Sequence, residues 1–491
     1  MTHVRALSMI GISLLLAAQA WSATEDPLPR RGYFGAVLDA DSEQGVRVRS
    51  VLPDSPAATS GLRAEDVVTH WGTDRVAPEN LMDFVRRIGA TPAGTTVEAE
   101  VLREGQETTI PIHIASLPLE SSADFETRYD SVEVDSHRQR VILTVPRGAG
   151  PHPALVYLQG VSCGSIESPL QPEDLDRHVA SEWTRNGFAV LRIEKSGVGD
   201  STGPPCSEIG FQDELRGYVA GLHWLTAQPG IDPQQIFLFG HSMGGVFAPL
   251  VAQQVPVRGI IVFGTIAAPV PQYFAENEER QMRMRGREGD ELDRELARVD
   301  TFIAGIFGDR LTPAELEARS PDLHDFLQFR GADATHLYGR HARFWHELDD
   351  VGLPAPWARV EAPVLAIWGQ ADYPASRGDH VLLAETVNNA GRTTATFLEM
   401  ENIGHGFDTA ASMRSSMVTR MAGPFNRAII DVTTEWMRQI GSVNSADCAL
   451  PESPMDCANR RRKLSVPGVT ARCVISRSAM SSTLFDAGAA G

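Results

Sequence analysis

Residues 236–244 read Ile-Phe-Leu-Phe-Gly-His-Ser-Met-Gly, an apolar run that ends in the pattern G-x-S-x-G. The apolar run predicts a buried strand, and residues 245–254 after it predict a helix. Gly240 and Gly244 allow the backbone to bend sharply between the two, so that the hydroxyl of Ser242 would project above the sheet. The stretch therefore predicts a turn that presents Ser242 as a nucleophile.

A serine hydroxyl is a weak nucleophile at neutral pH unless a base removes its proton, and that base needs a carboxylate to orient it. Residues 363–368 read Pro-Val-Leu-Ala-Ile-Trp, which predicts a buried strand, and Gly-Gln-Ala-Asp follows. Asp372 at the end of this run is the expected carboxylate, with Asp379 and Asp408 as fallbacks. An aspartate that only caps the next helix would also suit position 372.

The expected base is His405. Residues 402–407 read Asn-Ile-Gly-His-Gly-Phe and follow a strand-like run, so this histidine lies between two glycines in a loop. Of the 14 histidines, it alone has the order, the spacing and the loop setting that would let an imidazole reach Ser242. His241, beside the serine, is expected to have a structural role.

The order serine, aspartate, histidine and the runs around these residues resemble the α/β-hydrolase superfamily over about residues 125–440. The resemblance implies an α/β fold, the α/β-hydrolase fold, with a mostly parallel, doubly wound sheet and a helical cap. Short apolar runs and helix-favouring runs alternate as such a sheet requires. The expected strands are 140–145, 154–158, 188–193, 235–239, 259–263, 364–368 and 394–400, and the expected helices include 174–186, 213–227 and 426–440.

The resemblance also implies two backbone amides that stabilise an oxyanion. One is the amide of Met243, the residue after the nucleophile. The second is expected from residues 159–164, Gln-Gly-Val-Ser-Cys-Gly, where Val161 is assigned and Ser162 is the runner-up. The family usually has His-Gly where this chain has Gln-Gly, but a main-chain donor survives that change.

Two further segments fit the same resemblance. Residues 194–201, Glu-Lys-Ser-Gly-Val-Gly-Asp-Ser, look like the superfamily's glycine-rich loop and are expected to support the fold without a catalytic role. Residues 265–360 interrupt the sheet pattern with a charged, helix-favouring run at 276–298 and with several aromatic residues. A cap at this place would set substrate size and exclude water. A solvated helical decoration is the alternative.

A second resemblance precedes the first. Residues 31–37 (Arg-Gly-Tyr-Phe-Gly-Ala-Val), 51–58 (Val-Leu-Pro-Asp-Ser-Pro-Ala-Ala) and 61–68 (Gly-Leu-Arg-Ala-Glu-Asp-Val-Val) look like a PDZ domain of the bacterial periplasmic protease type. Such a small α+β domain, a partly open β-barrel, adds a peptide to a sheet edge and holds its terminal carboxylate with loop amides. A PDZ domain that only packs against its neighbour is the alternative. The expected groove residues are Tyr33, Phe34, Gly35, Ala36, Leu81, Phe84 and Val85.

The length of 491 residues fits two domains with additional termini. Near the start, Arg5, a short apolar run and Ala-Gln-Ala are typical of a cleaved secretory signal, and the run is too short for a membrane span. We therefore expect a periplasmic or secreted protein. The expected segments are a signal peptide at 1–23, the PDZ domain at 30–116, a linker at 117–125, the hydrolase-like domain at 126–440 and a low-order tail at 441–491.

The positions of the cysteines and the net charge of the chain argue for some classes of function and against others. Cys163 and Cys206 lie on loops that begin at adjacent strand ends in the implied topology, and they are expected to form a disulfide in an oxidising compartment. The spacing of the five cysteines does not suit a metal site. A formal net charge of -19 argues against a nucleic-acid partner, because a phosphate backbone attracts a basic surface.

These patterns predict an exported serine hydrolase that cleaves carboxylic esters through an acyl-enzyme, without a metal or organic cofactor. A serine peptidase of the aminopeptidase or oligopeptidase type, guided by the PDZ domain, is the main alternative. A non-catalytic, PDZ-based peptide-binding protein is the alternative of another class, although a scaffold has no use for three such residues in this order. The expected partners are a small acyl ester or peptide substrate and a peptide C-terminus in the PDZ groove.

Overall fold

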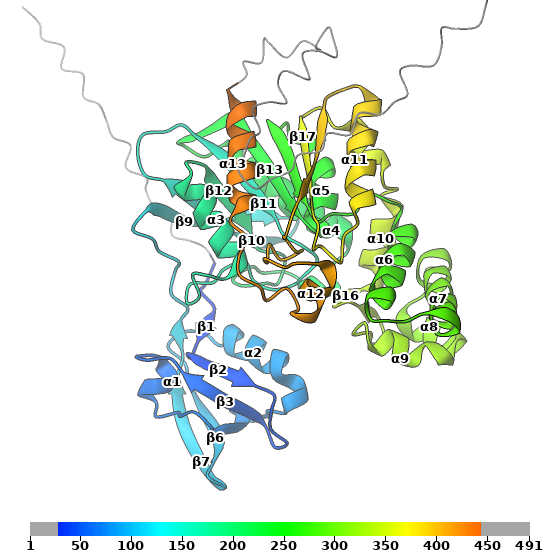
Figure 1. Cartoon of the computed structure of the whole chain (residues 1–491). Coiled ribbons are helices and arrows are strands. Elements are labelled where there is room, and N and C mark those ends of the chain that lie inside the picture. The colour runs from blue at the N-terminus through cyan, green and yellow to red at the C-terminus, as the bar shows by residue number, and fades with distance from the viewer. Residues whose placement is uncertain (1–27, 443–491) are drawn as a thin grey trace, which may run out of the picture.

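The computed structural model describes residues 28–442, which form a small lobe and a larger one (Figure 1). The expected signal peptide, and all but the first two residues of the expected tail, lie outside this range. Between residues 28 and 442, no helix is both long and apolar enough to cross a membrane.

The small lobe is an antiparallel sheet with two helices. Its strands lie in the order β2-β3-β4-β6-β7, and β5 pairs with β4. The core forms around Trp71, whose ring contacts Phe34 and Phe84 at centroid distances of 5.7 and 5.5 Å. The elements are β2 Ala36–Asp39, β3 Val46–Val51, α1 Pro56–Thr59, β4 Val67–Trp71, β5 Asp74–Arg75, α2 Leu81–Ala90, β6 Thr96–Arg103 and β7 Gln106–His113.

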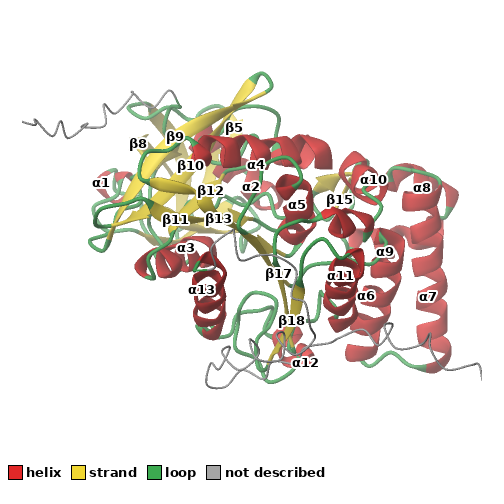
Figure 2. Ribbon diagram, turned by 90° about the horizontal axis from the view of Figure 1, so that it is seen from above, coloured by secondary structure: helices red, strands yellow, loops and turns green. Residues whose placement is uncertain are grey.

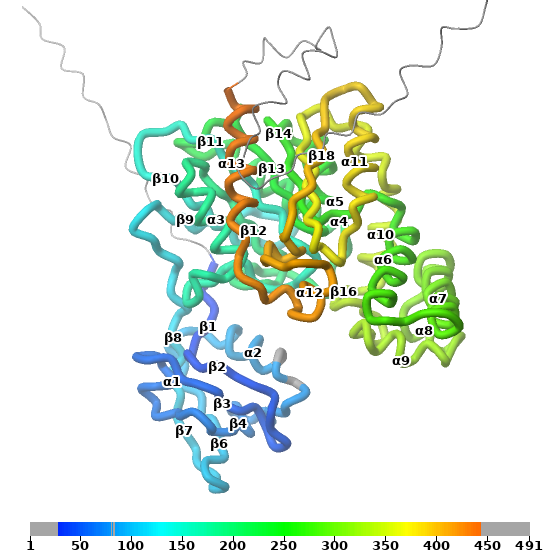
Figure 3. The backbone as a smooth tube through the Cα atoms, viewed as in Figure 1, coloured from blue at the N-terminus to red at the C-terminus, as the bar shows by residue number. Residues whose placement is uncertain are grey.

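The chain enters and leaves the small lobe side by side. Strand β1 (Gly32–Tyr33) pairs antiparallel with β8 (Ala115–Ser116), and the N–H of Leu117 donates to the carbonyl of Arg31 at 3.0 Å. Figure 3 shows this pair of strands as the connection between the lobes. The small lobe is therefore held to the larger one at both of its ends.

The larger lobe is built on an eight-stranded sheet in the order β18-β17-β14-β13-β11-β12-β10-β9. Six neighbouring strands are parallel, namely β12, β11, β13, β14, β17 and β18. In contrast, β10 pairs antiparallel with β12 and with β9. The strands are β9 Phe125–Val134, β10 His137–Pro146, β11 His152–Leu158, β12 Ala189–Ile193, β13 Ile231–His241, β14 Gly259–Phe263, β17 Val364–Gly369 and β18 Ala395–Met400.

Helices cover both faces of this sheet (Figure 2). Along β13, Ile236 and Leu238 pack into one buried cluster, and Phe237 and Phe239 pack into the other. A strand that is buried on both faces needs apolar residues at consecutive positions, which explains the unbroken run before Ser242. One face carries α3 (Leu175–Arg185) and α13 (Ala428–Gly441), and the other carries α4 (Phe211–Thr226), α5 (Met243–Ala252) and α11 (Arg377–Ala390).

The strand order reverses at β11. After β11 the chain passes to β12 on one side, and it then returns to β13 on the other side. Ligand sites in open α/β sheets form outside the carboxyl ends of the strands where the order reverses in this way. Leu158 and Gly240 are register partners, so the loop after β11 and the turn after β13 begin side by side.

The cap is formed by residues between β14 and β17, as expected, but its internal structure differs from the expectation. The helix-favouring run at 276–298 is split into α6 (Val270–Met284) and α7 (Gly289–Ile303), because Gly286 between them takes a φ angle of 87° and Gly289, at the start of α7, one of 53°. A short hairpin also lies within the cap, made of β15 (His336–Leu337) and β16 (Arg340–His341). The remaining helices are α8 Pro313–Arg319, α9 His324–Gln328, α10 Ala342–Asp350 and, beyond β18, α12 Met413–Val418.

Candidate active site

The turn after β13 holds Ser242 in a strained backbone conformation, with φ 54° and ψ -122°. Such strain is characteristic of a nucleophile turn between a strand and a helix. A Cβ on Gly240 would lie 2.6 Å from the carbonyl oxygen of Gly244, and a Cβ on Gly244 would lie 1.9 Å from that of Leu158. Both positions therefore require glycine for the turn to close.

Asp372 and His405 form a buried pair. Nδ1 of His405 lies 3.0 and 3.1 Å from the two carboxylate oxygens of Asp372, whose side chain is 0% exposed. Asp372 follows β17, and its carboxylate also accepts from the N–H of Ala375 at 2.8 Å. The histidine follows β18, the neighbouring strand, so that parallel strands deliver both side chains to the same edge of the sheet.

The two fallback aspartates have other partners. Asp379 accepts from the N–H groups of Ala267 and Ala268 at 2.9 Å, at the start of the cap. Asp408 accepts from the hydroxyl of Ser416 at 2.9 Å. The geometry therefore assigns His405 to Asp372.

Two sets of contacts link the residues around Ser242 to the pair of Asp372 and His405. The N–H of Ser242 donates to the carbonyl of Phe263 at 2.9 Å, and a Cβ on the next residue, Gly264, would lie 2.7 Å from Asp372 Oδ2 and 2.8 Å from His405 Nδ1. On the other side, Nε2 of His241 lies 2.8 Å from the carbonyl oxygen of His405. The structure thus brings the three expected residues to one place, at the carboxyl ends of β13, β17 and β18.

The charges around His405 favour the protonated form of its imidazole. Burial acts to lower the pKa of His405, but the negative charges of Asp372 and Asp408 and the hydrogen bond to Asp372 outweigh it, so the pKa lies above its usual value. For His241, burial and the nearby His405 outweigh the charge of Asp372 and lower the pKa to about 3. Of the two neighbouring imidazoles, only His405 is therefore suited to take up a proton near neutral pH.

The oxyanion loop, which we define as residues 159–164, lies against the nucleophile. A Cβ on Gly160 would lie 3.4 Å from Cβ of Ser242 and 3.8 Å from its Oγ. Within residues 28–442, the N–H groups of Val161 and Ser162 donate to no protein acceptor. Met243 is the first residue of α5, where helix N–H groups lack an intrahelical partner. The expected donors thus lie on the two segments next to Ser242.

A disulfide fastens the oxyanion loop. The sulfur atoms of Cys163 and Cys206 are bonded, which agrees with the expected pairing. Within the same loop, the side-chain amide of Gln159 donates to the carbonyl of Gly164 at 3.0 Å. The glutamine that replaces the usual histidine therefore serves as an internal brace.

Two buried basic residues at the oxyanion loop were not expected from the sequence. Lys195 belongs to the glycine-rich loop, for which only a fold-supporting role was expected, yet its Nζ contacts the oxyanion loop directly. Arg340 belongs to the cap hairpin and also contacts that loop. The one available signal was a lysine two residues after the apolar strand run that ends at Ile193, because a charge at such a place requires a partner.

The small lobe leaves the edge of β2 unpaired within the described residues, as a peptide-adding PDZ domain requires. Gly35, with φ 82°, has no room for a side chain, since a Cβ would lie 2.3 Å from Cβ of Ser55. Tyr33, Ala36 and Leu81 are half-buried, and Val85 is exposed. Phe34 and Phe84, in contrast, point into the core around Trp71, so Phe84 does not face the groove as expected.

Comparison with known families agrees with this architecture. The model of the alpha/beta hydrolase family matches residues 155–414, which is more than half of the chain, and the model of the PDZ domain matches residues 10–114. The chain therefore belongs to the alpha/beta hydrolase family and carries an N-terminal PDZ domain.

Individual relatives resemble one lobe or the other. Esterase EstD of Thermotoga maritima is 18% identical over 60% of this chain and 64% of its own length. A protein named "Probable periplasmic serine endoprotease DegP-like" from Marinomonas sp. is 28% identical over 26% of this chain and 30% of its own length. The chain thus spans less than two thirds of each of these relatives. Among solved structures, Est1E of Butyrivibrio proteoclasticus with ferulic acid aligns with a TM-score of 0.43 at 15% identity, over 64% of this chain and 99% of Est1E.

Proposed function

We propose that this protein is an exported serine hydrolase that cleaves carboxylic esters through a triad of Ser242, His405 and Asp372. The observation that carries the proposal is the buried Asp372–His405 pair at 3.0 Å beside a strained turn that presents the serine. A serine, a histidine and an aspartate in this arrangement form the machinery of acyl transfer.

In the first half of the reaction, Oγ of Ser242 forms a bond to the ester carbonyl carbon while its proton passes to Nε2 of His405. Asp372 holds Nδ1–H of the same ring and stabilises the imidazolium that results. The carbonyl electron pair moves to oxygen, and the N–H groups of Met243 and Val161 donate to that oxyanion. When the C=O bond re-forms, the C–O bond to the alcohol breaks, and the alcohol takes the proton from Nε2.

In the second half, a water molecule replaces the alcohol. His405 removes a proton from water, the resulting oxygen attacks the acyl carbon, and a second tetrahedral intermediate forms on the same amides. Its collapse releases the carboxylic acid and returns the proton to Oγ of Ser242. Each step uses only groups that the site contains, together with substrate and water.

Esters are the favoured substrates because the chain resembles EstD, a protein named as an esterase, over 60% of its length. A peptide substrate is the second candidate, and the observation in its favour is the PDZ domain, which resembles that of a protein named as a periplasmic endoprotease. The same triad and amides would serve either acyl group, so the leaving group has to be identified by experiment.

Export is part of the proposal. The disulfide between Cys163 and Cys206 supports it, because structural disulfides persist in oxidising compartments such as the periplasm and are rare in the cytosol. Fractionation of cells that produce the whole chain, with immunodetection in the periplasmic and cytosolic fractions, tests this part. Retention of the full-length chain in the cytosol would contradict it.

Covalent labelling of Ser242 by a fluorophosphonate tests the catalytic part, with Ser242→Ala as the matched control. We expect labelling of the wild type only, and hydrolysis of p-nitrophenyl butyrate that the control loses. Aminoacyl and peptidyl p-nitroanilides measured in parallel distinguish a peptidase from an esterase. A folded wild type that the probe does not label would instead favour a peptide-binding protein that acts through its PDZ groove.

A further inference from the structure

We propose that Lys195 and Arg340 are positioning residues that fix the amides of the oxyanion loop, so that the cap forms part of the catalytic apparatus. The inference rests on the proposed function, because it concerns the same oxyanion site. It goes beyond it by assigning roles to one residue of the glycine-rich loop and to one residue of the cap.

Lys195 holds two carbonyls of the oxyanion loop. Its Nζ donates to the carbonyl oxygen of Gly160 at 2.6 Å and to that of Ser162 at 2.8 Å. Arg340 holds the carbonyl between them, because its Nη1 donates to the oxygen of Val161 at 3.1 Å. Three consecutive carbonyls are therefore bound by two side chains that are each at most 1% exposed.

The direction of each carbonyl fixes the direction of the next amide. A peptide bond is planar and trans, so the N–H of one residue points opposite to the C=O of the residue before it. Lys195, by binding the oxygen of Gly160, fixes the N–H of Val161, which is the assigned oxyanion donor. Arg340, by binding the oxygen of Val161, fixes the N–H of Ser162, the runner-up.

Glu214 on α4 allows both cations to be buried there. Its carboxylate lies 2.9 Å from Nζ of Lys195 and 2.7 Å from Nη2 of Arg340, and its side chain is 2% exposed. A buried cation that lacked such a partner would be strongly unfavourable. The loop is thus tied to a charged cluster that α4, the glycine-rich loop and the cap hairpin build together.

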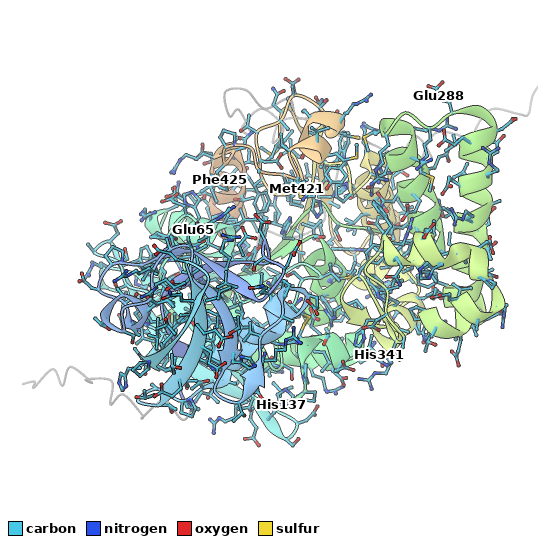
Figure 4. The ribbon with its side chains drawn as sticks, turned by 90° about the horizontal axis from the view of Figure 1, so that it is seen from below. Glu65, His137, Glu288, His341, Met421 and Phe425 are labelled. Atoms are coloured by element: carbon cyan, nitrogen blue, oxygen red, sulfur yellow. A yellow bond between two sulfur atoms is a disulfide. The ribbon has the colours of Figure 1, made fainter. Side chains whose placement is uncertain are left out.

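Arg340 connects the cap directly to the oxyanion loop. It lies on β16, and its guanidinium packs 3.8 Å from the ring centroid of Phe344 on α10. Figure 4 labels His341 at the end of the hairpin and Glu288 at the far end of the cap. A movement of the cap that displaced β16 would therefore release the carbonyl of Val161.

The cap offers an unusually close control for Arg340. Arg330 is also a buried cap arginine: it pairs with Glu278, packs 3.3 Å from the ring centroid of Phe326 and donates to a main-chain carbonyl at 2.6 Å. That carbonyl belongs to Phe326 within the cap rather than to the oxyanion loop. The two arginines thus share burial, ion pair and aromatic contact and differ in the loop that they hold.

The first experiment compares Arg340→Met with Arg330→Met, using p-nitrophenyl butyrate and fluorophosphonate titration to count active sites. Loss of one oxyanion donor costs about a hundred- to a thousand-fold in kcat. Arg340→Met frees the peptide plane directly after the assigned donor Val161, and the loosened loop should cost at least about tenfold in kcat. KM should stay within about threefold, because the interaction belongs to the transition state. Arg340→Lys should restore most of kcat, and Arg330→Met should lower Tm without lowering kcat per titrated site.

The second experiment uses the pH dependence of Lys195. Burial lowers the pKa of its ammonium to about 8, with Arg340 acting in the same direction and Glu214 opposing it. The ionisable groups around it are its neighbour Glu194, whose pKa burial raises to about 7, Glu214 and Tyr218 on α4, Arg340 on β16 and Asp176 on α3. Wild-type kcat should fall as the pH rises through about 8, since the neutral amine binds the carbonyls more weakly. Lys195→Met should have a low kcat without this basic limb.

The outcomes separate the inference from the proposed function. If the wild type is neither labelled nor active, the proposed function fails, and this inference fails with it. If the wild type is active and Arg340→Met and Lys195→Met keep the wild-type kcat per titrated site, only the inference fails. An equal loss of kcat in Arg340→Met and Arg330→Met would likewise overturn it, because a general loss of cap packing would then suffice.

Discussion

Nε2 of His241 lies 2.8 Å from the main-chain oxygen of His405, so the residue next to the nucleophile holds the loop that carries the base. A carbonyl oxygen only accepts hydrogen bonds, and Nε2 of His241 must therefore carry the hydrogen. Because burial and the nearby His405 lower the pKa of His241 to about 3, this imidazole remains a neutral donor over the working pH range. It has the structural role that was expected of it.

Replacing His241 should weaken catalysis by releasing the base loop. In His241→Phe the ring volume remains, but the donor to His405 is lost. A misplacement of about 1 Å can cost about a hundred-fold in rate, so we expect kcat to fall between about tenfold and a hundred-fold. Steady-state kinetics, corrected for active sites by fluorophosphonate titration, measure the loss. A wild-type kcat in this variant would show that the contact does not position the base.

Asp372→Asn should lower kcat/KM by about 10,000-fold, because the amide no longer holds the imidazole in the correct tautomer. The pH profile supplies a second readout. A base must be neutral to act, so the rate rises with pH through the pKa of His405, which Asp372 helps to keep above its usual value. The acid limb of kcat/KM should therefore move to lower pH in the variant.

Asp379→Asn is the control for that measurement. Asp379 was a fallback for the catalytic carboxylate, but it accepts from main-chain N–H groups at the start of the cap and from the hydroxyl of Ser376. Its acid limb should stay at the wild-type pH. A shift in this variant and none in Asp372→Asn would reverse the assignment.

Removing the disulfide should reduce both stability and activity. The bond closes a sequence separation of 43 residues, and loss of such a bond typically costs about 2–4 kcal/mol. Because Cys163 belongs to the oxyanion loop, kcat should also fall in the double variant Cys163→Ser, Cys206→Ser. Thermal unfolding and steady-state kinetics measure the two effects. If Tm and kcat are unchanged, the bond does not brace the site.

Arg30→Ala should destabilise the junction of the two lobes. This arginine forms ion pairs with Glu167 and Asp200, whose side chains are at most 1% exposed. Removing one partner of a buried pair costs about 3–5 kcal/mol when the other charge is left alone. Here Glu167 keeps Arg31 and Asp200 keeps Arg140, so the expected loss is about 2 kcal/mol. Urea unfolding measures it. Arg47→Ala, which breaks an exposed pair with Glu65, is the control and should cost less than about 1 kcal/mol.

The parallel part of the sheet could be predicted because each strand between two helical layers is a continuous apolar run. β14 matches its expected range of 259–263, and β11, β12, β13, β17 and β18 differ from theirs only at the ends. β9 was not expected. It is an edge strand whose residues 126–131 are mostly polar, and only Phe125, Val132 and Val134 supply buried apolar side chains. Such a strand lacks the pattern by which the others are recognised.

The three candidate catalytic residues could be predicted because each lies in a short motif that follows a strand. The residues that hold the oxyanion loop could not. Lys195, Glu214 and Arg340 come from three separate segments, and their mutual neutralisation arises only when the cap hairpin folds onto α4. The prediction that Phe84 faces the peptide groove was wrong for a related reason. Helical spacing alone does not show which residues of a helix face the core and which face the groove.

The antiparallel contact of β1 with β8 determines how the two lobes can be separated. Because Gly32 pairs with Ser116, the two ends of the PDZ domain lie side by side, as the ends of an inserted domain do. Cutting the chain after residue 117 would discard Arg30 and Arg31, and the carboxylate of Glu167 would lose the guanidinium groups of both. A hydrolase lobe produced on its own therefore has to keep residues 28–31 and join them directly to residue 117, so that the PDZ domain is removed from within the chain and not cut from its end.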